Sequence, residues 1–157
     1  MNDILEELKA ALLAAIGNSL TTYYTGEVVL VPKTYLPALM IFGNSTNLIA
    51  KSTAKDQTVH DITIRVVMDV ADKFDETGTG LIVKAHQDLI DIMEEREAGG
   101  QPKAATVLGV LRANIKGTDY LFNNDITINY QTLERDEFFY VQAECNFTAT
   151  TDLVTRP

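Results

Sequence analysis

The stretch from Asp61 to Val70 restricts the fold more than any other part of this sequence, because its side chains alternate in polarity. The apolar positions are Ile62, Ile64, Val66, Met68 and Val70, and Asp61, Thr63, Arg65 and Asp69 lie between them. Successive side chains of a β-strand point to opposite faces of a sheet, so this period of two predicts a strand with one buried and one polar face. Such a strand requires a second layer over its apolar face.

Two segments have the helical spacing that this second layer needs. We expect Asp3 and Glu6 to cap a helix over residues 3–16, which Gly17-Asn18 ends. A second helix is expected to begin with the acidic stretch 75–79 and to run to about Glu97. The apolar stripes consist of Ile4, Leu8, Ala11, Leu12 and Ala15 in the first helix, and of Ile82, Ala85, Leu89, Ile92 and Met93 in the second.

Five shorter segments predict further strands from their β-branched and aromatic content: 27–31, 38–42, 105–112, 125–130 and 138–148. The side chains expected to point inward in the last two are Ile126, Ile128, Tyr130, Phe139, Val141, Ala143, Cys145 and Phe147. Residues 133–137 predict the turn of this antiparallel pair. The polar stretch 43–58 predicts a long projecting loop or loose hairpin.

The expected fold class is therefore α+β, in one domain over residues 1–157: a single mixed, largely antiparallel sheet with two main helices packed on one face. A hydrophobic content of 46% in 157 residues is enough for one core but not for two domains. What the opposite sheet face contacts stays open, because water and a shared channel between subunits are both compatible with polar residues.

Charge and cysteine usage exclude several functional classes. The net charge of −9 argues against a protein that binds nucleic acid by neutralising phosphates. The single cysteine, Cys145, excludes an internal disulfide. The N-terminal segment lacks the basic region and cleavage site of a signal peptide, and no apolar run approaches membrane-spanning length. We therefore expect a protein assembled in the cytoplasm without a membrane partner.

Patterns that suggest a catalytic, cofactor or metal site are incomplete. The turn Gly78-Thr79-Gly80 lacks the third glycine of a dinucleotide-binding motif, because Val83 stands there. Asp69, Asp72, Asp75 and Glu76 do not have the spacing of a calcium loop. His60 and His86 lack a second ligand at metal-binding spacing, and Cys145 is in phase with the buried face of its strand. We expect no catalytic residue, no cofactor and no metal.

Four features together resemble the tail terminator, or tail completion, proteins of long-tailed bacteriophages. They are the amphipathic N-terminal helix, the segment 35–41, the strand 61–68 leading to the helix 80–97, and the closing strand pair. The resemblance spans nearly the whole chain in size and element order. It implies a non-enzymatic virion protein that forms a homohexameric ring on the head-proximal end of the tail tube. Such a ring stops tube growth, presents a surface to head-completion or connector proteins, and lets the genome pass through its lumen.

An acidic chain suits such a conduit, since like charge keeps DNA from adhering to the wall. The candidate lumen-facing residues are Asp61, Thr63, Gln142, Glu144 and Asn146, although Arg65 shares their face. An ordinary solvated sheet face explains the same alternation equally well. The projecting segment supplies Asn44, Lys51 and Lys55 as a candidate inter-subunit loop, with a surface loop as the alternative.

Two other functions are compatible with the sequence. Another neck component, such as a head-completion or connector protein, would share the same general features. A small nucleotide-binding or enzymatic domain that uses His86, Cys145 or the Gly78–Gly80 turn belongs to a different class.

Overall fold

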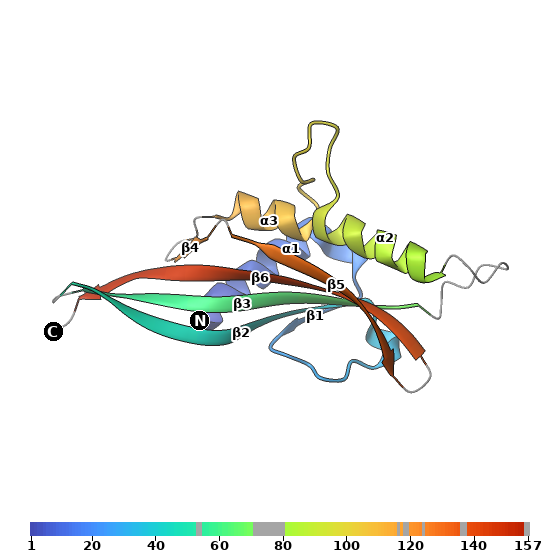
Figure 1. Cartoon of the computed structure of the whole chain (residues 1–157), viewed down its shortest axis with the longest axis horizontal. Coiled ribbons are helices and arrows are strands. Elements are labelled where there is room, and N and C mark those ends of the chain that lie inside the picture. The colour runs from blue at the N-terminus through green and yellow to red at the C-terminus, as the bar shows by residue number, and fades with distance from the viewer. Residues whose placement is uncertain are drawn as a thin grey trace.

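A computed structural model describes residues 1–52, 55–70, 81–115, 117, 120–123, 125–135 and 138–155. Within these residues the chain has an α+β fold, in which three α-helices lie on one side of a curled, mixed sheet of six strands (Figure 1). The helices are α1 (Asn2–Ile16), α2 (Leu81–Glu94) and α3 (Val107–Ala113). The strands are β1 (Thr22–Thr25), β2 (Ala38–Ser52), β3 (Lys55–Asp69), β4 (Tyr120–Phe122), β5 (Thr127–Arg135) and β6 (Phe138–Thr155). Short 3₁₀ turns occupy Gly17–Ser19 and Lys33–Tyr35.

The sheet has the strand order β1-β2-β3-β6-β4, and β5 also pairs with β6. Among the described strands, β1 and β2 are parallel and the other pairs are antiparallel. The strand β6 pairs with β5 over residues 138–146 and with β4 over residues 149–151. The largely antiparallel sheet expected from the sequence is confirmed.

The core lies between the helices and the sheet face that they cover. Helix α1 packs on β1 and β2, and α2 packs on β3 and β6. The alternation predicted for the strand at 61–70 is confirmed, because its five apolar positions are all buried. The helices contribute the buried side chains Ile4, Leu5, Leu8, Leu12, Ile16, Ala85, Leu89 and Met93. The hydrophobic stripes of α1 and α2 therefore face the sheet, as expected, although the side chain of Ile82 lies outside the described part of the structure.

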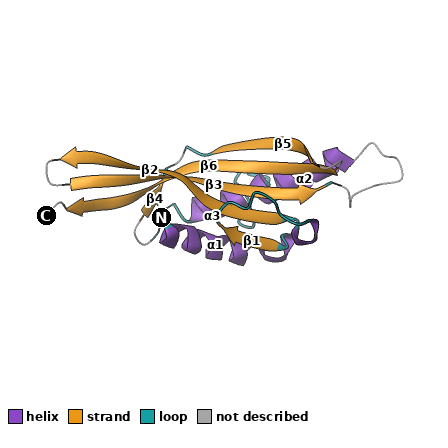
Figure 2. Cartoon of the chain, turned by 90° about the horizontal axis from the view of Figure 1, so that it is seen from below, coloured by secondary structure: helices purple, strands orange, loops and turns teal. Residues whose placement is uncertain are grey.

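The projecting segment is a β-hairpin. Strands β2 and β3 remain paired from Ala38↔Val67 to Ser52↔Lys55, with irregularities between Gly43 and Ser45 and between Ala50 and Ser52. We call residues 45–52 and 55–61 of this hairpin the arm. The arm and the C-terminal part of β6 extend beyond the helices (Figure 2). The hairpin alternative for residues 43–58 is thus the correct one.

The strand predicted at 105–112 is wrong, because α3 occupies this region. Thr106 begins the helix, and its Oγ1 accepts a hydrogen bond from the Gly109 amide at 3.0 Å. All residues from 107 to 111 are buried. A short run that is buried throughout carries no period that separates a strand from a helix.

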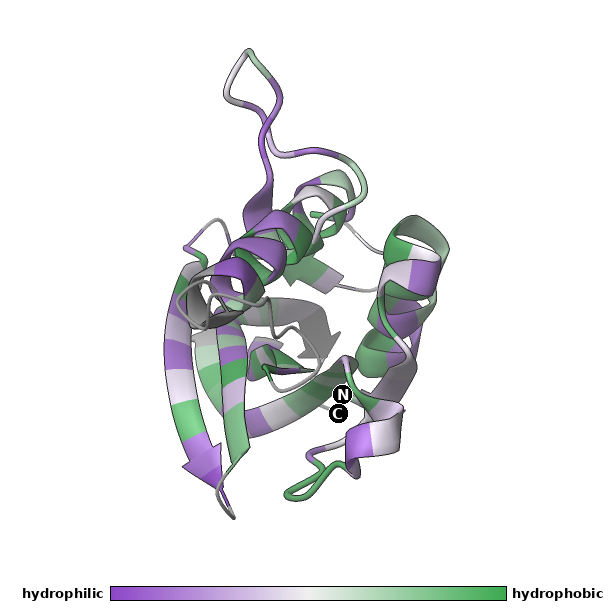
Figure 3. Ribbon diagram, turned by 90° about the vertical axis from the view of Figure 1, so that its right-hand side faces the viewer, coloured by the Kyte–Doolittle hydropathy of each residue, from purple (hydrophilic) through white to green (hydrophobic). Residues whose placement is uncertain are grey.

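The strand predicted at 27–31 is also wrong. The strand in this region is β1, in the more polar stretch before it, and β1 pairs with residues 38–41 of β2. The apolar run instead forms part of segment 26–37, which lies under the sheet on the side away from the helices. In Figure 3 the apolar run of this segment is the green loop below the sheet. Tertiary contacts here override a local β-propensity.

Several predicted boundaries need correction. Helix α1 begins at Asn2 after Met1, and no side chain caps it, so the capping role of Asp3 is wrong. Helix α2 ends at Glu94, and its predicted start at 75–79 lies outside the described residues. The predicted turn at 133–137 begins too early, because β5 continues to Arg135, and residues 136 and 137 lie outside the described part of the chain. Phe139 is 44% exposed, since the end of the β5–β6 hairpin curves away from the helices (Figure 1).

Candidate functional site

The candidate lumen residues lie on one face of the sheet, opposite the helices. Cross-strand pairing places Thr63 beside Asn146 and Arg65 beside Glu144. Gln142 lies opposite Val67, and Asp61 lies opposite Thr148. Directly paired residues point to the same side of a sheet. We call the sheet face opposite the helices, on which these residues lie, the second face. The structure thus brings all five predicted residues together on it.

Thr63 lies at the centre of a hydrogen-bonded row across three strands. The Asn44 side-chain amide donates to Thr63 Oγ1 at 2.7 Å, and Thr63 Oγ1 donates to Asn146 Oδ1 at 2.6 Å. The irregularity between Gly43 and Ser45 places Asn44 for this contact, as β-bulges commonly re-aim a side chain. Thr63 is only 3% exposed. It therefore joins β2, β3 and β6 from within, while Asn146 stays half-buried at the surface.

Arg65 neutralises two carboxylates near this row. Its Nε donates to Glu144 Oε1 at 2.7 Å, and its Nη1 donates to Glu27 Oε1 at 2.8 Å. Its guanidinium also lies 4.9 Å from the centroid of the Phe42 ring. Burial by itself lowers the pKa of Arg65, but the two carboxylate contacts outweigh burial and raise it. The second face is therefore less acidic than its sequence suggests, and segment 26–37 is tied to it through Glu27.

The predicted inter-subunit residues lie in the arm or next to it. Asn44 lies at the base of the arm and is exposed, although its amide is bonded within the chain. Lys51 and Lys55 lie in β2 and β3 close to the turn of the hairpin. Their side chains are outside the described part of the structure. Two large apolar residues, Leu48 and Ile49, are exposed on the arm by 66% and 41%.

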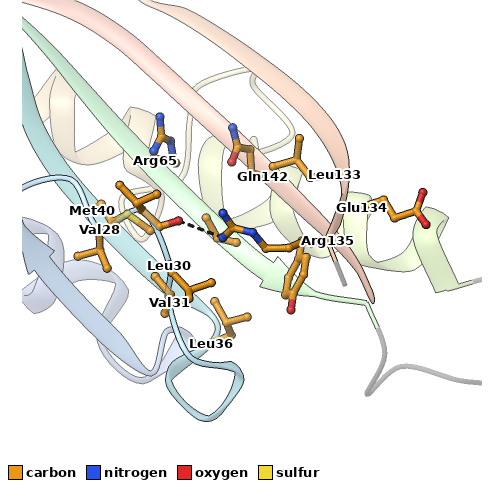
Figure 4. A pocket seen from close by; sticks show the side chains of 13 residues that line it. Val28, Leu30, Val31, Leu36, Met40, Arg65, Leu133, Glu134, Arg135 and Gln142 are labelled. Atoms are coloured by element: carbon orange, nitrogen blue, oxygen red, sulfur yellow. Dashed lines mark hydrogen bonds between the residues drawn. The ribbon is translucent and has the colours of Figure 1, made fainter. Parts of the chain in front are cut away.

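An apolar groove of about 310 Å³ lies between segment 26–37 and the β5–β6 hairpin (Figure 4). One wall contains residues 28–31 and Leu36, and the other contains Leu133 and Tyr140. The floor includes Met40 and Val67 of the second face. The Arg135 guanidinium donates to the Val29 carbonyl at 3.1 Å and so joins the two walls. Val29 and Leu30 remain 79% and 63% exposed. We call this feature the groove.

Sequence reasoning missed the groove because its walls come from distant segments. Arg135 and Val29 are separated by 106 positions. The sequence feature that could have indicated the groove is the apolar run 28–31 before Pro32, but such a run is also compatible with an exposed loop.

Each of the two histidines lies beside a threonine hydroxyl, and the cysteine lies in the core. His86 Nε2 is 2.8 Å from Thr132 Oγ1, and His60 Nδ1 is 3.0 Å from Thr46 Oγ1. Cys145 is fully buried, and burial followed by the charge of Glu94 raises its pKa to about 12. A thiol in this state is a poor nucleophile at neutral pH. The two histidines are therefore held by hydrogen bonds, and the cysteine is held by packing.

Acidic groups are not gathered into a cation site within the described residues. No set of three or more His, Cys, Asp and Glu side chains is placed there to hold a metal ion. Asp69 is nearly buried, and its Oδ2 lies 3.2 Å from Lys33 Nζ. Asp72, Asp75, Glu76 and the Gly78–Gly80 turn lie outside the described residues.

His60 gives the stability of the fold a dependence on pH. Burial, followed by the positive charge of the N-terminal amine, lowers its pKa below 6.5. The unfolded chain therefore binds a proton at His60 more readily than the folded protein does. The stability that neutral His60 contributes is complete above pH 6.5 and is lost as the pH falls toward the folded-state pKa. We expect urea unfolding to show a smaller loss between pH 7.5 and pH 5.5 for His60→Gln than for the wild type. Equal losses would contradict this assignment.

The comparisons with known proteins give no family assignment. A scan of the sequence against models of protein families finds no match, and a search of curated proteins also finds none. Among the described helices, none is both long enough and apolar enough to cross a membrane. The geometry of the chain is therefore the basis for assigning a function.

Proposed function

We propose that this protein is a tail terminator subunit of a long-tailed bacteriophage. In this proposal it has no enzymatic activity, and six copies form a ring on the head-proximal end of the tail tube in the virion. The ring stops tube polymerisation and presents a surface to head-completion or connector proteins. The element order that resembles this family supports the proposal. So does the α+β fold with helices on one sheet face.

The observation that carries the proposal is that two strands of the sheet have open edges. Among the described residues, β5 has no strand partner on its edge away from β6, and β2 has none on its edge away from β3 beyond Ile41, where its pairing with β1 ends. Open strand edges offer unpaired backbone groups, which proteins usually cover. Two different open edges on one subunit suit the heterologous contacts of a closed ring.

The part of the second face next to the arm is proposed to line the lumen of this ring, and Gln142 lies where this part borders the groove. Asp61, Gln142, Glu144 and Asn146 are partly exposed on it, whereas Thr63 supports them from below. Thr63 donates to Asn146, and Gln142 donates to Glu144. The basic group on this face, Arg65, is held by the carboxylates of Glu144 and Glu27. A polar wall within an acidic protein allows DNA to pass without specific binding, since binding would need clustered positive charge.

Purified tail tubes provide the test. We expect electron micrographs of tubes incubated with the protein to show a ring at one end only, and tube elongation from added tube subunits to stop there. The matched control is tubes without the protein, which continue to elongate. A protein that stays monomeric and never localises to tube ends would exclude the proposed function.

A further inference from the structure

Two exposed apolar surfaces of this chain lie too far apart to cover each other. The arm, with Leu48 and Ile49, is at one end of the long axis, and the β5–β6 hairpin that forms a groove wall reaches toward the other end (Figure 1). Exposed apolar patches of this kind commonly mark interaction sites. From their placement, we propose that the arm of one subunit docks in the groove of a second copy of this chain. The proposal rests on the ring proposed above and specifies its contact.

The shapes of the two surfaces correspond. Leu48 pairs with Thr58 and Ile49 with Gln57, so these neighbours project from opposite faces of the arm. The groove has apolar residues on both walls, with Val29 and Leu30 on one and Leu133 on the other. An arm with an apolar side chain on each face can therefore contact both walls at once.

The exposed apolar area is of the right order for a contact between subunits. Val29, Leu30, Leu133 and Phe138 are 79%, 63%, 39% and 46% exposed. Phe138 pairs with Arg135 at the hairpin end and lies under Lys33, so it continues the groove surface. These four residues expose roughly 400 Å², about half of the ~800 Å² that each partner buries in a standard interface. The backbone and polar rim can supply the rest.

Charge favours a second copy as the occupant. The chain has a net charge of −9, so two copies repel each other at most relative orientations. The arm is an exception, because Lys51 and Lys55 balance its two carboxylates, Asp56 and Asp61, and leave it without net charge. The groove is a second exception, because Arg65 and Arg135 line it together with Glu134. The arm and the groove can therefore meet between two acidic subunits without the repulsion that other orientations carry.

Engineered cysteines test this contact directly. The variants Leu48→Cys and Leu30→Cys place one thiol on each surface, and oxidised glutathione supplies the oxidant for disulfide formation. In an equimolar mixture of the two variants, we expect the cross-linked heterodimer to exceed either homodimer by at least about tenfold, because docking raises the effective thiol concentration. A chain with both substitutions should form a ladder of oligomers that ends at the closed ring. Peptide mass spectrometry identifies the linked positions.

Two controls make the result specific. Leu13→Cys places a thiol on α1 at a residue that is 49% exposed, comparable with Leu48 but away from the groove. The buried Cys145 should leave the wild type without cross-links. The proposal is overturned if Leu48→Cys links equally well to Leu13→Cys, if the homodimer of the Leu30→Cys variant dominates and so indicates a groove-to-groove dimer, or if no heterodimer forms.

The outcome is separable from that of the proposed function. Tubes that are capped by the double variant without a disulfide between the arm and the groove would exclude the docking contact and leave the terminator function standing. A specific disulfide between these two surfaces in a protein that never caps tubes would establish the contact between copies and exclude the terminator function.

Discussion

Replacement of Leu12 by alanine is expected to lower the free energy of unfolding by about 3 kcal/mol, as is typical when a buried leucine leaves a cavity. Leu12 is fully buried in the core between α1 and the sheet. Alanine is the better helix former, so helix propensity does not explain a loss. Urea denaturation measures the change as a lower midpoint at an unchanged slope.

The adjacent residue provides the matched control. Leu13 belongs to the same helix but is 49% exposed, so we expect Leu13→Ala to change stability by less than about 1 kcal/mol. If both variants lose the same free energy, α1 does not cover the sheet with the face described here.

Gly109→Ala is expected to destabilise the protein by about 2–3 kcal/mol, since a methyl group at this position has no space. The added Cβ would lie 2.1 Å from the Lys103 carbonyl oxygen. That oxygen accepts a hydrogen bond from the Thr106 hydroxyl at 2.7 Å, and the Lys103 amide donates to the Glu95 carbonyl at 2.8 Å. The backbone at Lys103 is therefore held from two directions and cannot move away without losing contacts.

Gly99→Ala is the control for this substitution. No atom lies within 4 Å of a Cβ at Gly99. We expect its melting temperature to stay within a few degrees of the wild type, whereas that of Gly109→Ala falls by roughly 8 °C or more. A well-tolerated Gly109→Ala would mean that α3 does not pack against residues 103 and 104 in this way.

The sequence predicts the elements whose pattern is local. The strand at 61–70 and the helix at 3–16 each show their period within a short stretch of consecutive residues, and both are confirmed. Helix α3 has five consecutive buried residues, so its sequence shows no period that predicts a helix. The contact that begins the helix is the cap at Thr106. The run 27–31 has strand propensity, but its position is determined by distant contacts from Arg65 and Arg135.

The candidate site could be predicted only in part for the same reason. Alternation identifies which residues share the second face, because the period of a strand is fixed. It does not show that Thr63 is buried beneath Asn44 and Asn146, or that Arg65 is paired with two carboxylates. The groove depends on contacts across most of the chain, which no local spacing encodes.

The length of β6 has a mechanical consequence. This strand runs for 18 residues, roughly 60 Å, and remains hydrogen-bonded to β3 from the helix-covered body to the outer end of the hairpin. A load applied along the strands shears many hydrogen bonds together, whereas a load applied across them separates the bonds one after another. The part of β3 and β6 that extends beyond the helices therefore resists tension along its strands and transmits this tension to the body of the subunit.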